Sequence, residues 1–270
     1  MERLKRAMEK ARESGAVVAS PLDINPVRQI AKVTPTEIFS LRVQVMEVDP
    51  RSLERHRIIA GDKEDLRTTS FDVLRTQVLR EMRKNGARTL VVTSPNPGCG
   101  KTTVAINLAL SIGQLSEPGV VLGDLDFRRP KVAEYLGIRP EKDLSDYVAG
   151  SSTLEEVLID PGIGDLRLLP NTKAHRNAAE LLTSPRMQAL VETLKTDERG
   201  PVSVFDLPPL LSTDDTIAFL SHADAILLVV ADGSTKKLEL EESLRLLEGA
   251  PLLGVVLNKS DASLKPYSYY

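Results

Sequence analysis

The chain has 270 residues, of which 41% are hydrophobic and 27% charged, and this is ordinary for a globular protein with one large α/β domain and extensions. Its formal net charge of −3 gives no reason to expect a nucleic-acid partner, because nucleic-acid-binding surfaces usually carry a basic stripe. The longest apolar run, residues 225–231, is too short to span a membrane, and residues 1–15 lack the apolar core of a signal peptide. We therefore expect a cytoplasmic protein with no transmembrane segment of its own.

The first 62 residues are charged and irregular, and we assign them to an N-terminal extension. Residues 1–12 predict a short helix, with Leu4, Met8 and Ala11 on one face and basic residues around it. Prolines then interrupt the segment at positions 21, 26, 35 and 50. Since proline breaks regular structure, this part of the extension is predicted to be a linker with a few short ordered pieces.

The domain that carries function is predicted to cover residues 63–262. Apolar residues recur at helical spacing from Phe71 to Met82, which indicates an amphipathic helix before the first strand. Short β-branched runs then predict strands at 89–93, 120–124, 166–169, 202–206, 225–231 and 254–258. Most of these runs are continuously apolar, as in parallel strands covered on both faces. The pattern predicts a doubly wound, mainly parallel α/β sheet. Residues 263–270 are predicted to form a mobile C-terminal tail.

A glycine-rich segment follows the first predicted strand and opens a helix. The run SPNPGCGKTT, residues 94–103, matches the G-x-x-x-x-G-K-[ST] pattern except at its first position, which is Pro95. Gly98 and Gly100 would let the backbone N–H groups turn toward phosphates, and the helix beginning near Lys101 would add its positive dipole end. Lys101 would reach the β- and γ-phosphates, and the Thr102 hydroxyl would ligate Mg²⁺. The sequence therefore predicts an ATP·Mg²⁺ site in a P-loop NTPase of the deviant-Walker type.

Two further strands end in aspartates. Val120–Asp124 continues into Leu125 and Asp126, and Val202–Asp206 is followed by a Leu-Pro-Pro turn. An aspartate at a strand end can also act as a plain helix cap. However, ligands of open α/β sheets bind at the carboxyl ends of the strands, so we expect these carboxylates to converge on the phosphate site.

The three segments SPNPGCGKTT, VVLGDLDFRRP and VSVFDLPPLL together resemble the nucleotide motifs of the bacterial tyrosine kinases of exopolysaccharide synthesis. Within that group the chain is most similar to the stand-alone autokinases of exosortase-linked systems. The stretches AELLTSPRM, residues 179–187, and GVVLNK, residues 254–259, extend the resemblance. It covers roughly residues 68–270.

The resemblance implies a role for each matching residue. Lys101 would bind phosphate, Asp124 would be the candidate base for an attacking phenol, and Asp126 would support the metal site. Magnesium would be held by Thr102, Asp124 and Asp206. The nucleotide-binding residues would be Pro97, Gly98, Cys99, Gly100, Lys101, Thr102, Thr103 and Asn258.

The resemblance also implies substrates and partners. The tail tyrosines Tyr267, Tyr269 and Tyr270 would be phosphorylated in trans by a neighbouring subunit of a homo-oligomer, of which a ring is one form. The activating partner would be a membrane-spanning regulator of polysaccharide chain length on a separate chain. Through that partner the protein would be peripheral at the inner face of the membrane.

Two departures from the family pattern bear on assembly. The family often carries a Glu-x-x-Arg-x-x-Arg helix that joins subunits, and the matching positions here are Thr69, Asp72 and Arg75, so that only the last is kept. The tail holds three tyrosines, a small cluster for the family, although these are three of only five tyrosines in the chain.

Three other functions share parts of this pattern. A partition-type ATPase switch would have the same strand ends, but it usually carries an additional lysine where this chain has residues 94–97. A GTPase would explain the N-K-x-D run at residues 258–261, but it would place a glycine where the Leu-Pro-Pro turn follows Asp206. A nucleotide-gated scaffold without transfer chemistry also remains open.

Overall fold

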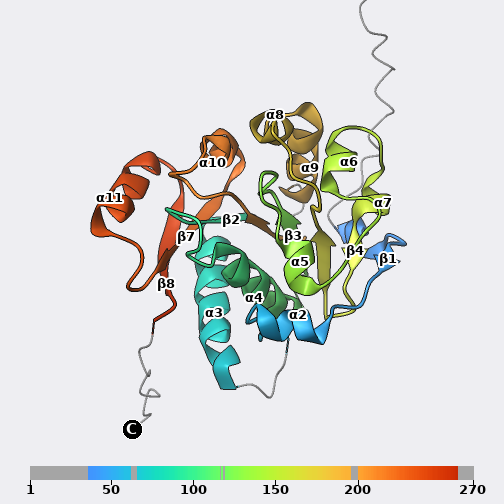
Figure 1. Cartoon of the computed structure of the whole chain (residues 1–270). Coiled ribbons are helices and arrows are strands. Elements are labelled where there is room, and N and C mark those ends of the chain that lie inside the picture. Colours follow the sequence, from blue (N-terminus) through green and yellow to red (C-terminus); the bar gives the residue numbers. More distant parts are fainter. Residues whose placement is uncertain (1–35, 62–65, 116, 118, 196–199, 261–270) are drawn as a thin grey trace, which may run out of the picture. The chain divides into compact units, whose positions relative to one another are not determined.

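The computed structural model describes residues 36–61, 66–115, 117, 119–195 and 200–260 (Figure 1). Within this part, eight strands form one sheet with the order β1-β4-β5-β3-β6-β2-β7-β8. The strands are β1 (Gln44–Val45), β2 (Thr89–Thr93), β3 (Val120–Asp124), β4 (Ile159–Asp160), β5 (Leu166–Leu169), β6 (Val202–Asp206), β7 (Ala225–Ala231) and β8 (Leu252–Asn258). Every pair is parallel except β4 with β5, so the predicted mainly parallel sheet is confirmed.

Helices connect the strands and cover both faces of the sheet (Figure 1). They are α2 (Pro50–Arg55), α3 (Thr69–Lys84), α4 (Lys101–Gly113), α5 (Val132–Leu136), α6 (Leu144–Val148), α7 (Leu154–Val157), α8 (Ala178–Leu182), α9 (Pro185–Lys195), α10 (Asp215–Phe219) and α11 (Lys237–Leu246). Three short 3₁₀ turns are η1 (Thr36–Ser40), η2 (Leu66–Thr68) and η3 (Leu220–His222). Among the described residues, no helix is both long and apolar enough to cross a membrane.

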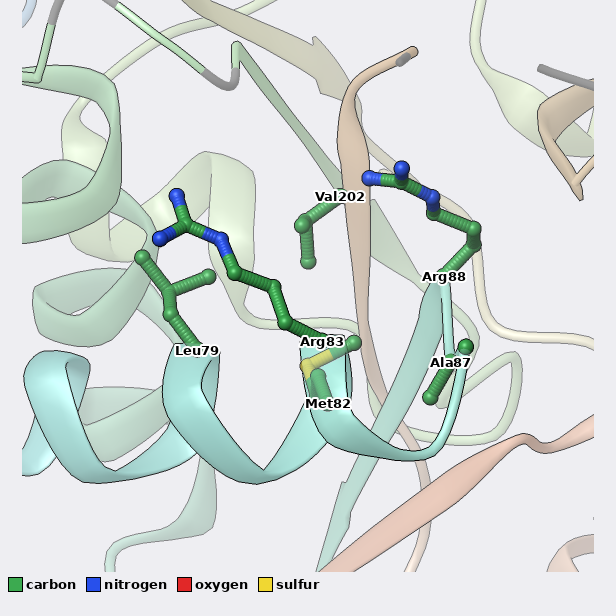
Figure 2. A pocket seen from close by; sticks show the side chains of 7 residues that line it. Leu79, Met82, Arg83, Ala87, Arg88 and Val202 are labelled. Carbon is green, nitrogen blue, oxygen red and sulfur yellow. The ribbon is translucent and has the colours of Figure 1, made fainter. Parts of the chain in front are cut away.

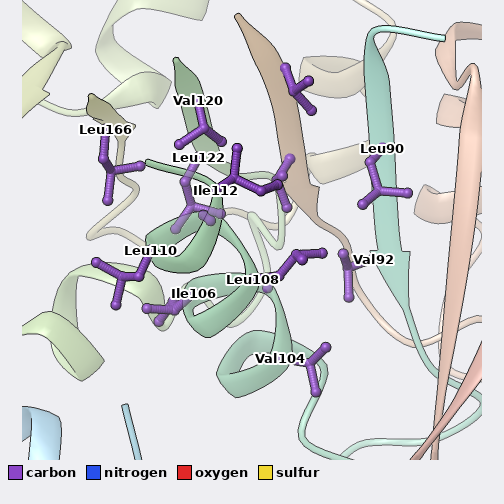
Figure 3. Close-up of a cluster of buried hydrophobic side chains, with 14 of the residues drawn as sticks. Leu90, Val92, Val104, Ile106, Leu108, Leu110, Ile112, Val120, Leu122 and Leu166 are labelled. Atoms are coloured by element: carbon purple, nitrogen blue, oxygen red, sulfur yellow. The ribbon is translucent and has the colours of Figure 1, made fainter. Parts of the chain in front are cut away.

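The core consists of one apolar layer on each side of the sheet. On one side, α4 packs its valines, leucines and isoleucines against Leu90, Val92, Val120 and Leu122 (Figure 3). On the other side, Val91 and Val121 face the layer that contains α6, α8 and α9. Because neighbouring residues of a strand point to opposite faces, both faces of β2 and β3 are buried, which explains their continuous apolar runs.

Residues 36–61, which the sequence analysis placed in the extension, contribute to this domain. β1 pairs with β4, and α2 packs near α5. Ile38 and Ile58 are buried in the two apolar layers. The side chain of Asn107 on α4 fixes the chain that follows α2: its Oδ1 accepts from the N–H groups of Ile59 and Ala60 at 2.7 and 2.9 Å. The predicted helix at residues 1–12 lies outside the described residues.

Candidate active site

The glycine-rich loop connects β2 to α4 at the carboxyl edge of the sheet. Gly98 and Gly100 have φ angles of 85° and 92°, in the left-handed region that glycine adopts without strain. α4 begins at Lys101, directly after Gly100. The local sequence therefore produces the predicted strand, turn and helix start, the arrangement in which backbone N–H groups and the helix dipole favour an anion.

The Lys101 ammonium is the centre of a buried cluster of charged groups. Its Nζ lies 3.0 Å from Asp126 Oδ2 and 3.2 Å from Asp206 Oδ1. The Thr102 hydroxyl donates to Asp206 Oδ2 at 2.6 Å. Asp124 belongs to the same group of charges, since β3 and β6 are neighbours and Asp124 pairs in register with Asp206. The structure thus brings together five residues from three separate segments of the chain.

Carboxyl groups outnumber the ammonium in this cluster, which holds three of them and one lysine. Burial raises the pKa of Asp206, and burial together with the charge of Asp206 raises that of Asp124. Burial alone would lower the pKa of Lys101, but the charges of Asp206 and Asp126 outweigh it and raise that pKa above its ordinary value. Lys101 therefore stays charged at neutral pH. The carboxyl oxygens of the cluster are ligands of the kind that a divalent cation prefers.

Asp124 is fully buried and held by the backbone of the following loop. Its Oδ2 accepts from the N–H groups of Lys131 and Val132 at 2.8 and 2.9 Å, and its Oδ1 accepts from the Asp126 N–H at 3.2 Å. Asp126 is 5% exposed. Asp124 thus fixes the turn that begins α5, while Asp126 contacts Lys101 directly.

The last residue of β8, Asn258, contacts the glycine-rich loop. The Asn258 carboxamide donates from Nδ2 to the Cys99 carbonyl at 2.9 Å. The Cys99 side chain is buried, with its sulfur 3.6 Å from the Thr235 hydroxyl. Asn258 therefore lies beside the other predicted nucleotide-binding residues, because it contacts the loop that contains them. Thr103 lies in the first turn of α4, where its hydroxyl donates to the His56 carbonyl at 3.5 Å.

A matched pair of glycine substitutions tests this packing. A Cβ on Gly100 would lie 2.2 Å from Asn258 Nδ2, whereas a Cβ on Gly98 would meet nothing within 4 Å. Because both φ angles are positive, Gly98→Ala is expected to cost about 1–2 kcal/mol from backbone strain alone. Gly100→Ala is expected to cost more and to displace Asn258. Urea denaturation of the nucleotide-free variants measures both costs, and equal losses would contradict the role of Asn258.

Hydrogen bonds also fasten the loop after β6 to the loop after β2. The N–H groups of Leu210 and Leu211 donate to the carbonyls of Ser94 and Pro95 at 2.8 and 3.0 Å. On its other side this segment is tied by Arg128, whose Nε and Nη2 donate to the two oxygens of buried Asp215 at 2.5 and 3.0 Å. Neither Arg128 nor Asp215 is among the residues predicted from the sequence. The position of Arg128, two residues after Asp126 in the same loop, is the sequence signal that would have indicated a role for this arginine near the site.

The predicted phosphoacceptors and one histidine are not among the described residues of this cluster. The acceptor tyrosines, Tyr267, Tyr269 and Tyr270, lie outside the described residues. His175 is half-buried: its backbone N–H donates to the Phe127 carbonyl at 2.7 Å, and its ring lies edge-on to the Phe127 ring.

A cavity of about 330 Å³ at the opposite edge of the sheet does not belong to this site. Figure 2 shows it between the end of α3 and the first residues of β2 and β6, with Met82, Arg88 and Val202 in its lining. Because parallel strands expose their amino ends at that edge, it lies a full strand length from Lys101.

Comparison with known proteins places the chain in a family. No protein-family profile matches it. EpsB of Ralstonia nicotianae is 30% identical over 202 residues, which are 74% of this chain and 26% of EpsB, so the chain spans about a quarter of that relative. The tyrosine-protein kinase CpsD of Streptococcus pneumoniae is 30% identical over 186 residues, 67% of this chain and 79% of CpsD.

A solved structure agrees with these sequence matches. The kinase domain of the Escherichia coli tyrosine kinase ETK superimposes with a TM-score of 0.71 at 26% identity, covering 87% of this chain and 97% of that domain. The chain thus has the fold, the glycine-rich loop and the carboxylate cluster described above, and most of its length is similar to tyrosine-protein kinases. The chain belongs to the family of bacterial tyrosine-protein kinases.

Proposed function

We propose that this chain is an ATP-dependent protein-tyrosine autokinase that regulates the polymerisation or export of an exopolysaccharide. The observation that carries the proposal is the convergence of Lys101, Asp126 and Asp206 within 3.2 Å at the mouth of a glycine-rich loop. Phosphoryl transfer depends chiefly on positioning and charge stabilisation, and this cluster provides both. Membership of the tyrosine-kinase family supports the choice of a phenol as acceptor.

ATP would be held by the loop from Pro97 to Thr103, with Asn258 closing it. The donor set also fits Mg²⁺, which prefers hard oxygen ligands such as the Thr102 hydroxyl and the carboxylates of Asp124 and Asp206. The crowding of three carboxyl groups supports this assignment, since a divalent cation would favour their ionised forms. When bound, the ion would neutralise charge on the β- and γ-phosphates.

Lys101 would exchange its contacts with Asp126 and Asp206 for contacts with the phosphate oxygens. Asp126 would then be released to face the acceptor side of the site. Asp124 would act in transfer as a base or as the group that orients the acceptor, and its three backbone hydrogen bonds would hold it in place.

The acceptors would be Tyr267, Tyr269 and Tyr270 of a neighbouring copy. Each phosphate adds about −1.5 to −2 charges at pH 7, and several on one tail would be repelled by the carboxylates of the site. The unmodified form would then be assembled and the modified form dispersed.

Assembly would differ in one respect from the family pattern. Arg75, the position kept from the subunit-joining helix, donates to Asp72 Oδ1 at 2.9 Å and to the Ser111 carbonyl and hydroxyl at 3.1 and 3.0 Å. These contacts bind it to its own chain. We further propose that the protein forms a homo-oligomer and that a membrane-spanning regulator on a separate chain activates it. It would then be cytoplasmic and lie at the inner face of the membrane.

Labelling tests the activity and its acceptors together. Pure protein incubated with γ-labelled ATP and Mg²⁺ is expected to gain phosphotyrosine, which mass spectrometry will map to the tail. Replacing Tyr267, Tyr269 and Tyr270 by phenylalanine is expected to remove that signal and leave ATP affinity unchanged, because the phenol oxygens are the acceptors and not part of the nucleotide site. Replacing Tyr135 and Tyr147 by phenylalanine is the matched control.

If the triple variant is labelled as strongly as the wild type, the tail is not the substrate. If ATP binds and is hydrolysed but no tyrosine is labelled, the partition-type switch or the nucleotide-gated scaffold replaces the kinase.

A further inference from the structure

A second cavity, of about 510 Å³, lies between α2 and α5. Its volume is within the range of small-molecule sites. The junction of the two helices is tightly built: the Asp49 N–H donates to the Leu136 carbonyl at 2.9 Å, and Gly137 has φ 71°. A Cβ at Gly137 would lie 2.5 Å from the Asp49 Cβ, so this close approach requires glycine.

An unsatisfied amide belongs to the lining of this cavity. Asn171 follows β5 and is 1% exposed, and neither its Nδ2 nor its Oδ1 has a hydrogen-bond partner among the described residues. Leaving such a group unpaired costs about 1–3 kcal/mol. A ligand that offers both an acceptor and a donor would remove that cost.

The charges around the cavity favour an anion. Arg55 and Arg139 line it, and neither forms an ion pair with another residue in the described part of the chain. The two acidic residues of the lining are already engaged: Asp49 accepts from the Arg51 N–H and the Ser52 hydroxyl, and Glu134 pairs with Lys131. Two guanidinium groups without an ion-pair partner among the described residues suit a phosphate group, which they can bind through parallel charge-assisted hydrogen bonds.

Flat and apolar groups complete the lining. The His56 ring is stacked on Tyr135 with centroids 3.9 Å apart, and Pro130, Ile138 and Pro140 supply apolar surface. Such surface suits a planar ring. We propose that this cavity binds a phosphate monoester of a small molecule or side chain that also contains a planar ring, as in a phosphotyrosine side chain or a nucleoside monophosphate. The site is separate from the phosphate site at Lys101 and goes beyond the proposed kinase reaction.

The two walls of the cavity, α5 and the end of α2, are both linked to the phosphate site by hydrogen bonds. Ala133 and Glu134 line it from α5, whose first turn donates from Lys131 and Val132 to Asp124. On the other wall the His56 carbonyl accepts from the Thr103 hydroxyl. A ligand that moves α5 would therefore move Asp124, so occupancy of the cavity would be communicated to the carboxylate cluster.

Calorimetry on the full chain tests the site, with Lys101→Met as background so that the phosphate site does not bind the probes. The probes are N-acetyl-O-phosphotyrosine amide, AMP and inorganic phosphate. We expect saturable binding of at least one ester, weakened about tenfold or more by Arg55→Gln with Arg139→Gln. Lys237→Gln with Arg245→Gln on α11 is the control and should leave binding unchanged. The tighter ester identifies the source as a phosphorylated peptide or a nucleotide.

Asn171→Leu provides a second variant that should fold at least as well as the parent, because it removes an unpaired buried amide. It is expected to weaken ester binding and to leave the melting temperature unchanged or higher. Bound ester should also shift the amide resonances of Lys131 and Val132. Absence of binding at millimolar ester, binding that the double arginine variant retains, or inorganic phosphate binding as tightly as both esters would overturn the proposal. Because the background lacks transfer activity by design, the result is independent of the kinase assignment.

Discussion

Replacing Lys101 by methionine is expected to weaken ATP binding on the order of 10²–10³-fold, because charge-assisted hydrogen bonds to the phosphates are lost. The structure adds a second cause. Without the ammonium, Asp126 and Asp206 would present unneutralised, buried carboxylates to a polyanionic ligand. Equilibrium dialysis with labelled ATP and Mg²⁺ measures the effect.

Lys195→Met is the matched control for this change. Lys195 is also a partly buried lysine, paired with Asp224 at 2.7 Å, but it lies near the amino end of β2. It should retain wild-type ATP affinity, and melting curves of both variants will report any loss of fold. An ATP affinity of Lys101→Met within about threefold of wild type, or under roughly 0.7 kcal/mol, would contradict the assignment.

Asp124→Asn is expected to bind ATP and to lose on the order of 10²–10⁴ in the rate of phosphoryl transfer. The change removes a charge beside Asp206. Asparagine also has one acceptor oxygen where the carboxylate has two, so it cannot accept all the backbone N–H groups that Asp124 now satisfies. Single-turnover transfer at saturating ATP separates this loss from any change in binding.

Asp143→Asn is a control of equal burial. Asp143 is fully buried and accepts hydrogen bonds from Ser145 and Thr172, away from Lys101. Its substitution should lower stability but leave the transfer rate per folded molecule close to wild type. Undiminished transfer by Asp124→Asn would remove Asp124 from the reaction, and an equal loss in both variants would assign its effect to folding.

Six strands could be predicted from their apolar runs: β2, β3, β6 and β7 are buried along their whole length, β5 is buried except at Arg167, and β8 is partly exposed but keeps an apolar run. The bounds of β2, β3, β5, β6 and β7 agree with the predicted ranges, and β8 begins two residues earlier, at Leu252. β1 and β4 were missed, since each has two residues and no run of that length carries a periodic pattern. The convergence of Lys101, Thr102 and the aspartates followed from one rule, that carboxyl ends of parallel strands meet at one edge.

The short helix α2 in the segment of residues 36–61 was not predicted, for a physical reason. Pro50 was counted as a helix breaker, but it occupies the first turn of α2, where proline loses no hydrogen bond, and Asp49 caps that helix through the Arg51 N–H. The pairing of Arg128 with Asp215 could not be predicted either. It joins loops that are distant in sequence, and spacing along the chain says nothing about such a contact.

The strand order has a consequence for how the protein is made. β2, which carries the glycine-rich loop, pairs with β6 and β7 and with neither strand near it in sequence. Until the ribosome has released β6, which ends at Asp206, both edges of this apolar strand lack their partners, and the edge that pairs with β7 lacks its partner until about residue 231. Unpaired edges favour aggregation. Nascent chains should therefore be unable to retain ATP until late in synthesis, and they would depend on chaperones during that interval.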